Sequence, residues 1–409
     1  MQRLVALNHL LTNRLASFPQ TNSLSETYLN LTNFYTKDQK QLTEKINVFI
    51  RENILPLLDD AYDKAQFPPL IIEKFKQLDL FINFLKPPYG KGLSYSTLAF
   101  AIMELAKFDA SLATFFWLQM VVNMHTIESL GSEEQQNYYL PKMASLDLIS
   151  GWALTEPDIG SDASNIQTTA TPSKDGFLIN GKKRWIGNAN KDFNIVWAKN
   201  IETKKVEAFI VENDKEGVSS EVIKHKLALR IVQNCEITFK NVWVPQKNKI
   251  AGAKNFGVTT NMLTNSRSFV VWIVIGQVFT VFDKCVQYSL ERKQFGVPIG
   301  SFQLIQEKLS RMAGTINAMF LLCWRIMNLY EKKQHSLGQI SLCKAWVTAK
   351  GREVVALGRE IFGGNGIVID NFVMKAFADM EVLYTYEGTY DVNSLIAGRE
   401  LTGLNSFKN

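Results

Sequence analysis

The spacing of hydrophobic residues along the chain changes twice. From about residue 36 to 150, apolar residues recur every three to four positions, as in KDQKQLTEKINVFIRENILPLL, with Thr36 in the N-cap position. From Gly151 the period drops to two, in short runs such as FLIN, NIVWAK, AFIVEN and CEITFKNVWV, and after Gly257 long helical patterns return. We therefore expect a mainly α protein with a central β domain. Its expected parts are residues 1–35 (an N-terminal extension), 36–150 (helical), 151–257 (β) and 258–409 (helical).

The boundaries inside these parts are marked by prolines and by one acid. Pro68-Pro69 and Pro87-Pro88 should separate helices, since proline cannot continue a helix from within. The stretch YSTLAFAIMELAKFDASLATFFWLQMVV predicts two buried helices about a kink near Asp109. The β runs predict a compact antiparallel barrel or sandwich, and the helices after Gly257 predict a bundle. The apolar run at 269–282 is too short for a bilayer and carries Gln277, so we expect a buried core helix.

Composition and charge exclude several classes of function. The chain has 409 residues, of which 46% are hydrophobic, and this indicates a globular protein. Its four cysteines form no CxxC pair and its four histidines are far apart, so we expect buried free thiols and no metal site. The tightest basic run, Lys182-Lys183-Arg184, lies in a β pattern without aromatic residues for stacking, which favours a solvated strand edge over a nucleic-acid site. A net charge of +6 suits a polyanionic ligand such as a CoA thioester.

One carboxylate has a setting that suggests chemistry. Residues 384–391 read YTYEGTYD, which places Glu387 between two aromatic residues and a Gly–Thr turn. Partial desolvation should raise the pKa of Glu387 towards the range in which a base works best. Such a base could remove a weakly acidic C–H proton, provided another group accepts the hydride. The upstream run ALTEPDIGSD (153–162) is a candidate for holding that acceptor. Taken alone, Glu387 could equally be a helix-start acid and ALTEP a turn at the entry to the β domain.

Four ordered blocks resemble the acyl-CoA dehydrogenase/oxidase family. They are ALTEPDIGSD (153–162), GKKRWIGN (181–188), RKQFGVPIGSFQLIQEKL (292–309) and FGGNGI with YEGT (362–367 and 386–389). The likeness runs from about residue 36 to 408 and is greatest to the branch that holds plant short-chain acyl-CoA oxidase and glutaryl-CoA dehydrogenase. It implies an N-terminal helical domain, a β-barrel or sandwich middle domain and a C-terminal four-helix bundle. It also implies FAD, an acyl-CoA substrate and a homotetramer.

The resemblance assigns roles residue by residue. Glu387 matches the base that takes the α-proton of a saturated acyl-CoA, while the β-hydrogen leaves as hydride to flavin N5 and a trans-2-enoyl-CoA forms. Its backbone N–H matches a donor to the thioester carbonyl, where developing negative charge needs stabilisation. Matched FAD contacts are Thr155, Ser161, Trp185, Arg292, Gln294, Phe295, Gln303, Gly363, Gly364 and Thr389, and matched substrate contacts are Arg267 and Gly388. Of these, Arg292, Gln294, Phe295 and Gln303 match residues that reach the FAD of a neighbouring subunit; as isolated residues they could simply cap and pack a helix end.

Departures from the family pattern bear on the substrate and on the electron acceptor. Gly187 stands where most family dehydrogenases have threonine near flavin N5, and the freed space could admit O2 to the reduced flavin. Glu360 replaces a glutamine three residues before the Gly363-Gly364 pair. Ala113 aligns with the arginine that binds the far carboxylate in glutaryl-CoA dehydrogenase, so we expect a monocarboxylic acyl-CoA. Phe115, Phe116 and Trp117 either shorten the acyl pocket or pack in the core.

The amino terminus and the acceptor leave two alternatives open. The first 25 residues carry Arg3, His9 and Arg14 with no acid before Glu26, which is typical of a mitochondrial presequence and also nearly matches an amino-terminal peroxisomal signal. We expect the mitochondrial matrix, with the peroxisome as the alternative. Electrons would go to O2 or to an electron-transfer flavoprotein. The rival function is a dormant family member that serves as a structural subunit of a larger complex, and a lost base or a broken flavin site would be its mark.

Overall fold

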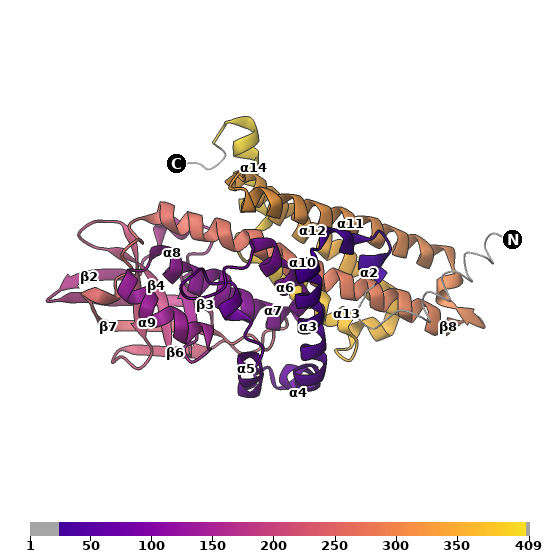
Figure 1. The fold of residues 1–409 in the computed structure, drawn as a ribbon, viewed down its shortest axis with the longest axis horizontal. Coiled ribbons are helices and arrows are strands. Elements are labelled where there is room, and N and C mark those ends of the chain that lie inside the picture. Colours follow the sequence, from indigo (N-terminus) through magenta and orange to yellow (C-terminus); the bar gives the residue numbers. More distant parts are fainter. Residues whose placement is uncertain (1–23, 406–409) are drawn as a thin grey trace.

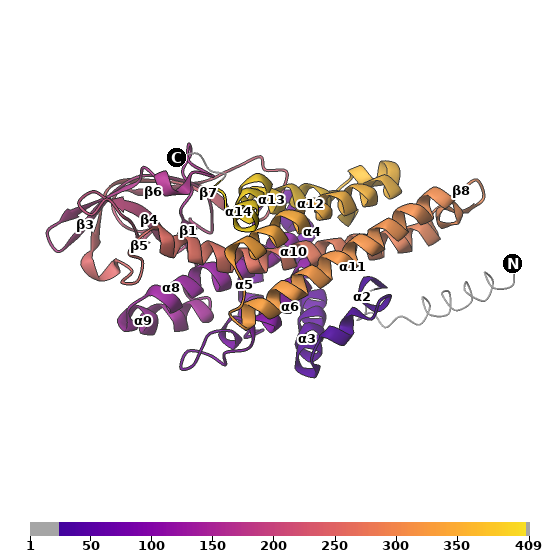
Figure 2. The same cartoon turned by 90° about the horizontal axis from the view of Figure 1, so that it is seen from above.

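The computed structural model of the chain describes residues 24–405. The molecule is elongated, with a β sheet at one end and long C-terminal helices running lengthwise to the other end, where the β8 strand lies (Figures 1 and 2). The N-terminal helices pack across the middle of these long helices. The expected order of helices, β domain and helices is confirmed.

The N-terminal helices begin and end where the chain chemistry requires. The hydroxyl of Thr36 accepts a hydrogen bond from Gln39 N and completes a capping box, which confirms it as an N-cap. The kink near Asp109 is also confirmed, because its carboxylate accepts hydrogen bonds from the backbone N of Ser111 (2.6 Å) and Leu112 (2.9 Å) and starts a new helix. The helices are α2 (Leu24–Thr27), α3 (Lys37–Asn53), α4 (Leu55–Lys64), α5 (Pro69–Lys76), α6 (Tyr95–Phe108), α7 (Ala110–Trp117), α8 (His125–Leu130) and α9 (Glu133–Ala144), with short 3-10 turns at Leu31–Phe34 and Phe81–Asn83.

A π-helix interrupts the helical run between α7 and α8. It spans Leu118–Met124, and all of its residues except Leu118 are buried. The wider turn redirects the side chains that follow α7, and such insertions are frequent at functional sites. Leu118, its first residue, is therefore the part of this segment that is free to reach another domain.

The middle domain is one curled sheet with the strand order β1-β4-β2-β3-β7-β6, and β5 pairs with β4. Its strands are β1 (Ser150–Ala153), β2 (Thr169–Ser173), β3 (Gly176–Gly187), β4 (Phe193–Asn200), β5 (Val206–Glu212), β6 (Val218–Val222) and β7 (Asn234–Pro245). The expectation of a purely antiparallel domain is wrong, since β4 pairs parallel with both β1 and β2. The long connections from β1 and β2 to β4 permit parallel pairing, and a period-two pattern carries no information about strand direction.

Strand β4 is buried on both of its faces. Val196 and Ala198 pack inside the curled sheet, whereas Ile195 and Trp197 face the helices and belong to their hydrophobic core. The alternation of side chains along a strand sends successive residues into these two cores. One face of the sheet is thus continuous with the helical part of the protein.

The C-terminal domain is built around α10 (Phe256–Glu291), a helix of 36 residues. By length and composition alone α10 could cross a membrane, but 78% of its most apolar window is buried inside the protein, which confirms the expected core helix. The amide nitrogen of Gln277 donates a hydrogen bond there to Ala106 O at the end of α6, while its amide oxygen has no partner among the described residues. Gly276 allows this close approach, since a Cβ would lie 2.3 Å from Met103 O. The other elements are the β8–β9 hairpin (Lys293–Gln294 and Val297–Pro298), α11 (Gln303–Glu331), α12 (Leu337–Phe362), α13 (Phe372–Thr385) and α14 (Tyr390–Thr402).

A buried ionic junction joins all three domains. Lys375 of α13 forms ion pairs with Asp109 of the N-terminal domain and with Asp379, which is 3.3 Å away on its own helix. The carboxylate of Asp379 also accepts a hydrogen bond from Leu229 N of the middle domain at 2.6 Å. All three charged side chains are nearly inaccessible, so each depends on the others for compensation.

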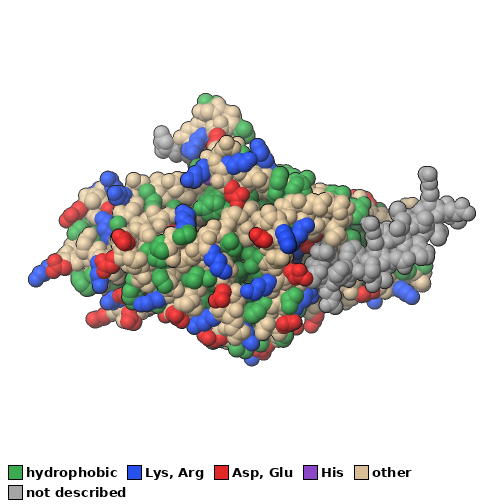
Figure 3. Space-filling model, viewed as in Figure 1, with side chains coloured by type: hydrophobic (Ala, Val, Ile, Leu, Met, Phe, Trp, Pro, Cys, Tyr) green, Lys and Arg blue, Asp and Glu red, His purple; other side chains and the backbone are tan. Residues whose placement is uncertain are grey.

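The surface and the thiols agree with the composition. On the face drawn in Figure 3, basic and acidic side chains are interspersed over the helices and the sheet, and no stripe of one sign stands out. Cys235, Cys285, Cys323 and Cys343 are all free and buried, as expected. Within residues 24–405, no three His, Cys, Asp or Glu side chains come together in a group able to hold a metal ion.

Candidate active site

Glu387 lies in a tight turn between α13 and α14. The backbone of Glu387 is left-handed, with a φ of 57°, and that of Gly388 has a φ of 86°. The left-handed conformation costs a non-glycine residue about 1–2 kcal/mol, so the surroundings must hold Glu387 there. At position 388 a Cβ would lie only 2.9 Å from Asn393 Nδ2 and 3.1 Å from Arg267 Nη2, which explains the glycine.

Two neighbouring residues of α10 bind Glu387 at both its side chain and its main chain. The hydroxyl of Ser266 donates a hydrogen bond to Glu387 Oε2. The Nε of Arg267 donates to the Glu387 carbonyl oxygen at 2.8 Å. Arg267 was matched to a substrate contact, and in the structure its Nε hydrogen bond goes to the backbone of Glu387. Because burial lowers the pKa of Arg267, the guanidinium depends on the charge of Glu387 for compensation.

Burial raises the pKa of Glu387 above its ordinary value, as its aromatic setting predicts. The hydrogen bond from Ser266 and the charges of Arg267 and Lys344 oppose this rise without cancelling it. Only one of the two flanking tyrosines contributes to the enclosure. The ring of Tyr386 lies 5.7 Å from that of Trp117, whereas Tyr384 stacks on Tyr390 at 5.6 Å, outside the site.

Of the three consecutive aromatic residues of α7, only Trp117 reaches this site. Its indole Nε1 donates to Ser266 O at 3.3 Å, so it is anchored to the residue that binds Glu387. Phe115 stacks on Phe67 at 4.7 Å, and Phe116 packs against Phe81 at 4.9 Å, so both belong to the core of the N-terminal domain.

Two buried hydroxyls lie on the same side of the site. Neither Thr114 Oγ1 nor Tyr386 Oη has a hydrogen-bond partner of good geometry in the described part of the chain. Ala113, the position that bears on a dicarboxylic substrate, is fully buried. The side of the site formed by α7 therefore combines apolar surface with two hydroxyls and presents no cation.

The TEP turn at 155–157 is held by a buried ion pair that the sequence analysis misread. Lys183 is fully buried, and its Nζ lies 2.9 Å from Glu156 Oε1 and 2.7 Å from Leu154 O. The solvated strand edge expected for Lys182-Lys183-Arg184 is therefore wrong at its central residue. The cause is the pleat: with alternate side chains on opposite faces, Lys183 points inward while Lys182 is exposed. Glu156 in turn accepts the backbone N–H groups of Gln167 (2.6 Å) and Thr168 (2.8 Å).

Trp185, near the end of β3, presents an open aromatic face next to this turn, where Arg184 N donates to Thr155 O at 2.9 Å. It lies where β3 and β7 shift register, its φ is 66°, and 51% of its surface is exposed. The guanidinium of Arg184 lies 5.0 Å from its ring. Close by, the buried Asn188 Nδ2 has no partner among the described residues. An exposed indole beside an unsatisfied amide donor fits a flat, hydrogen-bonding ring such as a flavin. Thr155 is half-buried and Ser161 exposed at the same turn.

The space beside Gly187 is not open in the structure. A Cβ on Gly187 would lie 2.8 Å from Cδ2 of Leu118, the first residue of the π-helix. Leu118 of the N-terminal domain therefore fills the space that a side chain at position 187 would take. Any path for O2 beside Gly187 would have to pass Leu118.

A second group of matched residues lies at the far end of the bundle, around the β8–β9 hairpin (Figure 2). Phe295 is 94% exposed at the tip of this hairpin, with its ring 6.0 Å from that of Phe302. Asn365, in the loop that follows the glycine pair, donates to Tyr288 Oη at 2.9 Å and so ties this loop to the end of α10. The residues at this end are Arg292, Gln294, Phe295, Gln303, Gly363 and Gly364. Within one chain, these residues lie at the opposite end of the molecule from the β sheet that carries Trp185.

One matched residue, Thr389, and one departure from the family pattern, Glu360, have structural roles in this chain. The hydroxyl of Thr389 accepts Val392 N at 3.2 Å and caps α14. Glu360 forms an ion pair with Lys308 at 2.5 Å, which ties α12 to α11. The charge of Glu360 is thus neutralised within the chain.

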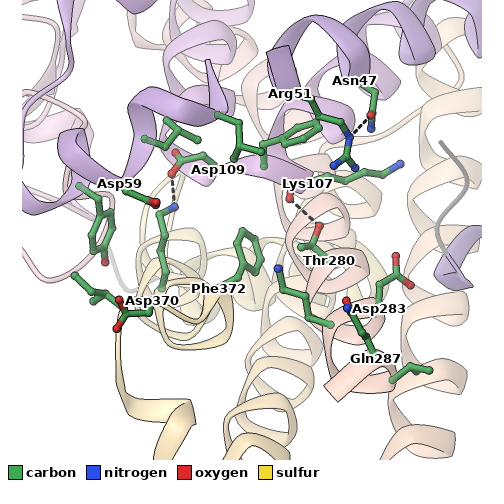
Figure 4. Close-up of a pocket in the computed structure, with 18 of the residues that line it drawn as sticks. Asn47, Arg51, Asp59, Lys107, Asp109, Thr280, Asp283, Gln287, Asp370 and Phe372 are labelled. Carbon is green, nitrogen blue, oxygen red and sulfur yellow. Dashed lines mark hydrogen bonds and ion pairs between the residues drawn. The ribbon is translucent and has the colours of Figure 1, made fainter. Parts of the chain in front are cut away.

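A cavity of about 920 Å3 lies apart from Glu387, between α3, α4, the last turns of α10 and the loop before α13 (Figure 4). Its buried charges already have partners: Lys375 pairs with Asp109, and Lys107 lies 2.8 Å from Glu104. A smaller cavity of about 170 Å3 adjoins the π-helix and Asn265, the residue before Ser266.

The sequence analysis missed three residues that shape the site: Ser266, Lys344 and Asn393. Asn393 Nδ2 donates to the carbonyl of Gly388 at 2.8 Å, and Lys344 Nζ donates to the same oxygen at 2.7 Å. Lys344 had a readable signal, because it falls on the apolar face of α12 at helical spacing from Ile340 and Thr348. Ser266 had none beyond its place next to Arg267.

Comparison with known proteins agrees with this geometry. Residues 36–147, 151–242 and 255–402 match the N-terminal, middle and C-terminal domains of acyl-CoA dehydrogenase. A 3-(aryl)acrylate reductase of Clostridium sporogenes is 30% identical over 90% of this chain and 99% of its own length. Subunit CarC of the caffeyl-CoA reductase-Etf complex of Acetobacterium woodii is 28% identical over 88% and 98%.

A solved structure extends the likeness to the cofactor. Glutaryl-CoA dehydrogenase of Mycobacterium smegmatis in complex with FADH2 has a TM-score of 0.91 and 26% identity, covering 95% of this chain and all of that one. Together with the exposed Trp185 and the unpaired Asn188 amide, this neighbour indicates FAD as the cofactor. The chain belongs to the acyl-CoA dehydrogenase family of FAD-dependent oxidoreductases that act on acyl-CoA thioesters.

Proposed function

We propose that this protein desaturates a short-chain acyl-CoA to the trans-2-enoyl-CoA, with Glu387 as the base. The observation that carries the proposal is the state of its carboxylate. It is partly buried, and in the described part of the chain its only hydrogen bond comes from the Ser266 hydroxyl. A structural carboxylate at this depth would normally have a cation or several donors on its oxygens. A carboxylate with free lone pairs and a raised pKa is suited to take a proton.

The chain's own residues supply binding and proton transfer. Bound FAD would accept the β-hydrogen as hydride. Trp185 offers the ring a stacking surface, and Thr155 and Ser161 lie on the adjoining turn. Glu387 would take the α-proton, and the left-handed turn fixes where its carboxylate lies. Holding the base in place in advance lowers the entropy cost of the reaction.

The shape of the α7 side supports a short monocarboxylic acyl group. Trp117 closes this side of the site against Tyr386, so little length is available to an acyl chain. Ala113 offers no charge to a second carboxylate, which would be left unpaired at a cost of several kcal/mol. Butyryl-CoA is therefore the first substrate to test.

Assembly and electron acceptor are part of the same proposal. The exposed residues around Phe295 would complete the FAD site of a neighbouring copy, which supports a homotetramer. The electrons would pass to O2 or to an electron-transfer flavoprotein, and the relative from the caffeyl-CoA reductase-Etf complex supports the second.

We propose the mitochondrial matrix, with the peroxisome as the alternative; the residues on which this rests, 1–23, lie outside the described part of the chain.

An anaerobic visible spectrum of the purified protein, titrated with butyryl-CoA and then opened to air, tests the proposal. Loss of a flavin band on titration would support the substrate and cofactor together. Recovery within seconds in air would identify an oxidase, and persistent bleaching would identify a dehydrogenase that needs a protein acceptor. A flavin band that no acyl-CoA bleaches would contradict the proposed reaction. Absence of any flavin would favour the structural-subunit alternative.

A further inference from the structure

Lys344 is a buried lysine beside the Glu387 turn that the proposed reaction does not use. It lies on α12 and is fully inaccessible to solvent. Its Nζ donates to the carbonyl oxygens of Tyr384 at 2.9 Å and Gly388 at 2.7 Å. These two carbonyls stand on either side of Glu387, so a single ammonium group connects both ends of the turn.

The surroundings of Lys344 act in opposite directions on the pKa of its amine. Burial lowers its pKa to about 7, while the charge of Glu387 raises it and that of Arg267 lowers it. Tyr384 belongs to the last turn of α13, and the negative end of that helix favours a cation there. In the described structure no carboxylate lies within ion-pair distance of Lys344, although Glu387 is the acid that acts on it.

The ionisable groups that act on Lys344 come from two of the elements packed against α12. Glu387 acts from the turn after α13, and Arg267 acts from α10. From α14, Asn393 presents a neutral amide to the same Gly388 carbonyl that Lys344 binds. Lys344 is therefore the cation that meets the turn from α12, and Arg267 is the cation that meets it from α10.

We propose that Lys344 is a positioning residue for the reaction, which holds both ends of the Glu387 turn and whose charge keeps that carboxylate ionised. This inference rests on the proposed function, since it concerns the base of that reaction. Arg267 fixes the carbonyl of Glu387 itself, and Lys344 fixes the carbonyls before and after it. Protonation of Lys344 and ionisation of Glu387 support each other, because each charge favours the opposite charge on the other group.

The test compares Lys344→Met, which removes the charge, with Lys344→Arg, which keeps it. The rate of anaerobic flavin bleaching by butyryl-CoA is measured against pH, beside flavin content, melting temperature and the KM for the substrate. We expect the acidic limb of the Met variant to move up by about one pH unit, which is about a tenfold loss of rate on that limb. The rate should recover at higher pH with little change in KM. The Arg variant should keep the acidic limb close to that of the wild type.

Thr348→Val is the matched control, because Thr348 lies one turn along α12 and, among the residues described, its hydroxyl bonds only to the carbonyls of Lys344 and Ala345 on its own helix. Its pH profile should equal that of the wild type. An unchanged acidic limb in Lys344→Met, or an equal loss of rate at every pH, would overturn the inference. So would failure of both Lys344 variants to fold with flavin, because Lys344 would then be a purely structural residue. If wild-type flavin is not bleached by any acyl-CoA, the proposed function fails first, and this outcome is distinct from the others.

Discussion

Ser266 donates its hydroxyl hydrogen to Oε2 of Glu387 from the neighbouring helix α10. This bond is the largest single influence that lowers the pKa of Glu387 against the effect of burial. Ser266 is in turn fixed through its backbone carbonyl, which accepts the indole N–H of Trp117 at 3.3 Å. The residue that lowers the pKa of Glu387 is thus anchored to Trp117, which packs against Tyr386.

Replacing Ser266 with alanine should raise the pKa of Glu387 further, because the ionised carboxylate loses its only hydrogen bond within the described structure. The base must be ionised to act, and a group with a raised pKa loses its ionised form as the pH falls through that pKa. We therefore expect the acidic limb of the rate profile to lie above the ordinary range for glutamate in the wild type, and higher still in Ser266→Ala. A pH profile of anaerobic flavin bleaching checks both, and a downward shift in Ser266→Ala would contradict this assignment.

Glu387→Gln should abolish the reaction while leaving the cofactor site intact. The amide cannot accept the α-proton, and loss of a positioned base costs about 10²–10⁴ in rate. The matched control is Glu381→Gln on the exposed side of α13, where Glu381 pairs with Arg352 at 2.8 Å. Stopped-flow bleaching should show normal rates for the control and flavin retention in both variants. A Glu387→Gln protein with near-normal bleaching would assign the base elsewhere.

Lys183→Met should destabilise the protein strongly. The lysine and its partner Glu156 are almost inaccessible to solvent, so the substitution leaves a buried carboxylate without its cation. Breaking such a pair costs about 3–5 kcal/mol. The adjacent Lys182 is exposed, and Lys182→Met should change the free energy of unfolding by less than about 0.5 kcal/mol. Chemical denaturation of the two variants measures the difference, and equal stabilities would show that the buried pair contributes nothing.

Gly187→Thr tests the contact with Leu118 together with the access of O2. The new side chain would meet Leu118 Cδ2, so overpacking of about 1–3 kcal/mol is expected. Adding Leu118→Ala should restore stability. If the space near the flavin controls oxygen access, reoxidation in air should slow in Gly187→Thr. Reoxidation at the wild-type rate in both Gly187→Thr and the double variant would reject a role for Gly187 in oxygen reactivity.

Substrate preference gives a prediction that needs no variant. Because no cation lies at Ala113, butyryl-CoA should be turned over better than glutaryl-CoA. Trp117→Ala should extend activity towards longer chains, whereas Phe116→Leu, in the core beside Phe81, should not. Relative kcat/KM values over a chain-length series decide this point. Faster turnover of glutaryl-CoA by the wild type would contradict the assignment at Ala113.

Local chemistry predicted part of this structure well. Thr36 as an N-cap and the break at Asp109 depend on neighbours within a few residues, which the sequence displays directly. The raised pKa of Glu387 was predicted from its flanking aromatic residues, although the groups that act on it, Ser266, Arg267 and Lys344, are distant in sequence. The parallel pairing of β1 with β4 could not be predicted, because strand direction is set by connections across the whole domain. Lys183 was misread for a related reason: which face of β3 is covered depends on Glu156, 27 residues earlier.

In the candidate site, too, local features could be predicted from the sequence and long-range contacts could not. The motif around Glu387 predicted a candidate base, but the residues that hold its turn come from α10, α12 and α14. None of them belongs to a recognisable motif, since a hydrogen bond to a backbone carbonyl requires only a donor at the right place. The sequence could not tell which of Phe115, Phe116 and Trp117 reaches the site, because three consecutive residues of a helix point in different directions. The structure shows that it is Trp117.

Because β4 is buried on both faces, the middle domain cannot be separated from the helices without exposing apolar side chains. Ile195 and Trp197 belong to the same hydrophobic core as the helices on either side of the sheet in sequence. A fragment cut at the family's domain limits would present these side chains to water, and it would also lose the acceptor for the Leu229 N–H that Asp379 provides. Because the three domains share this core and the Lys375 junction, we expect them to unfold as one cooperative unit, and calorimetry of the apoprotein should show a single transition.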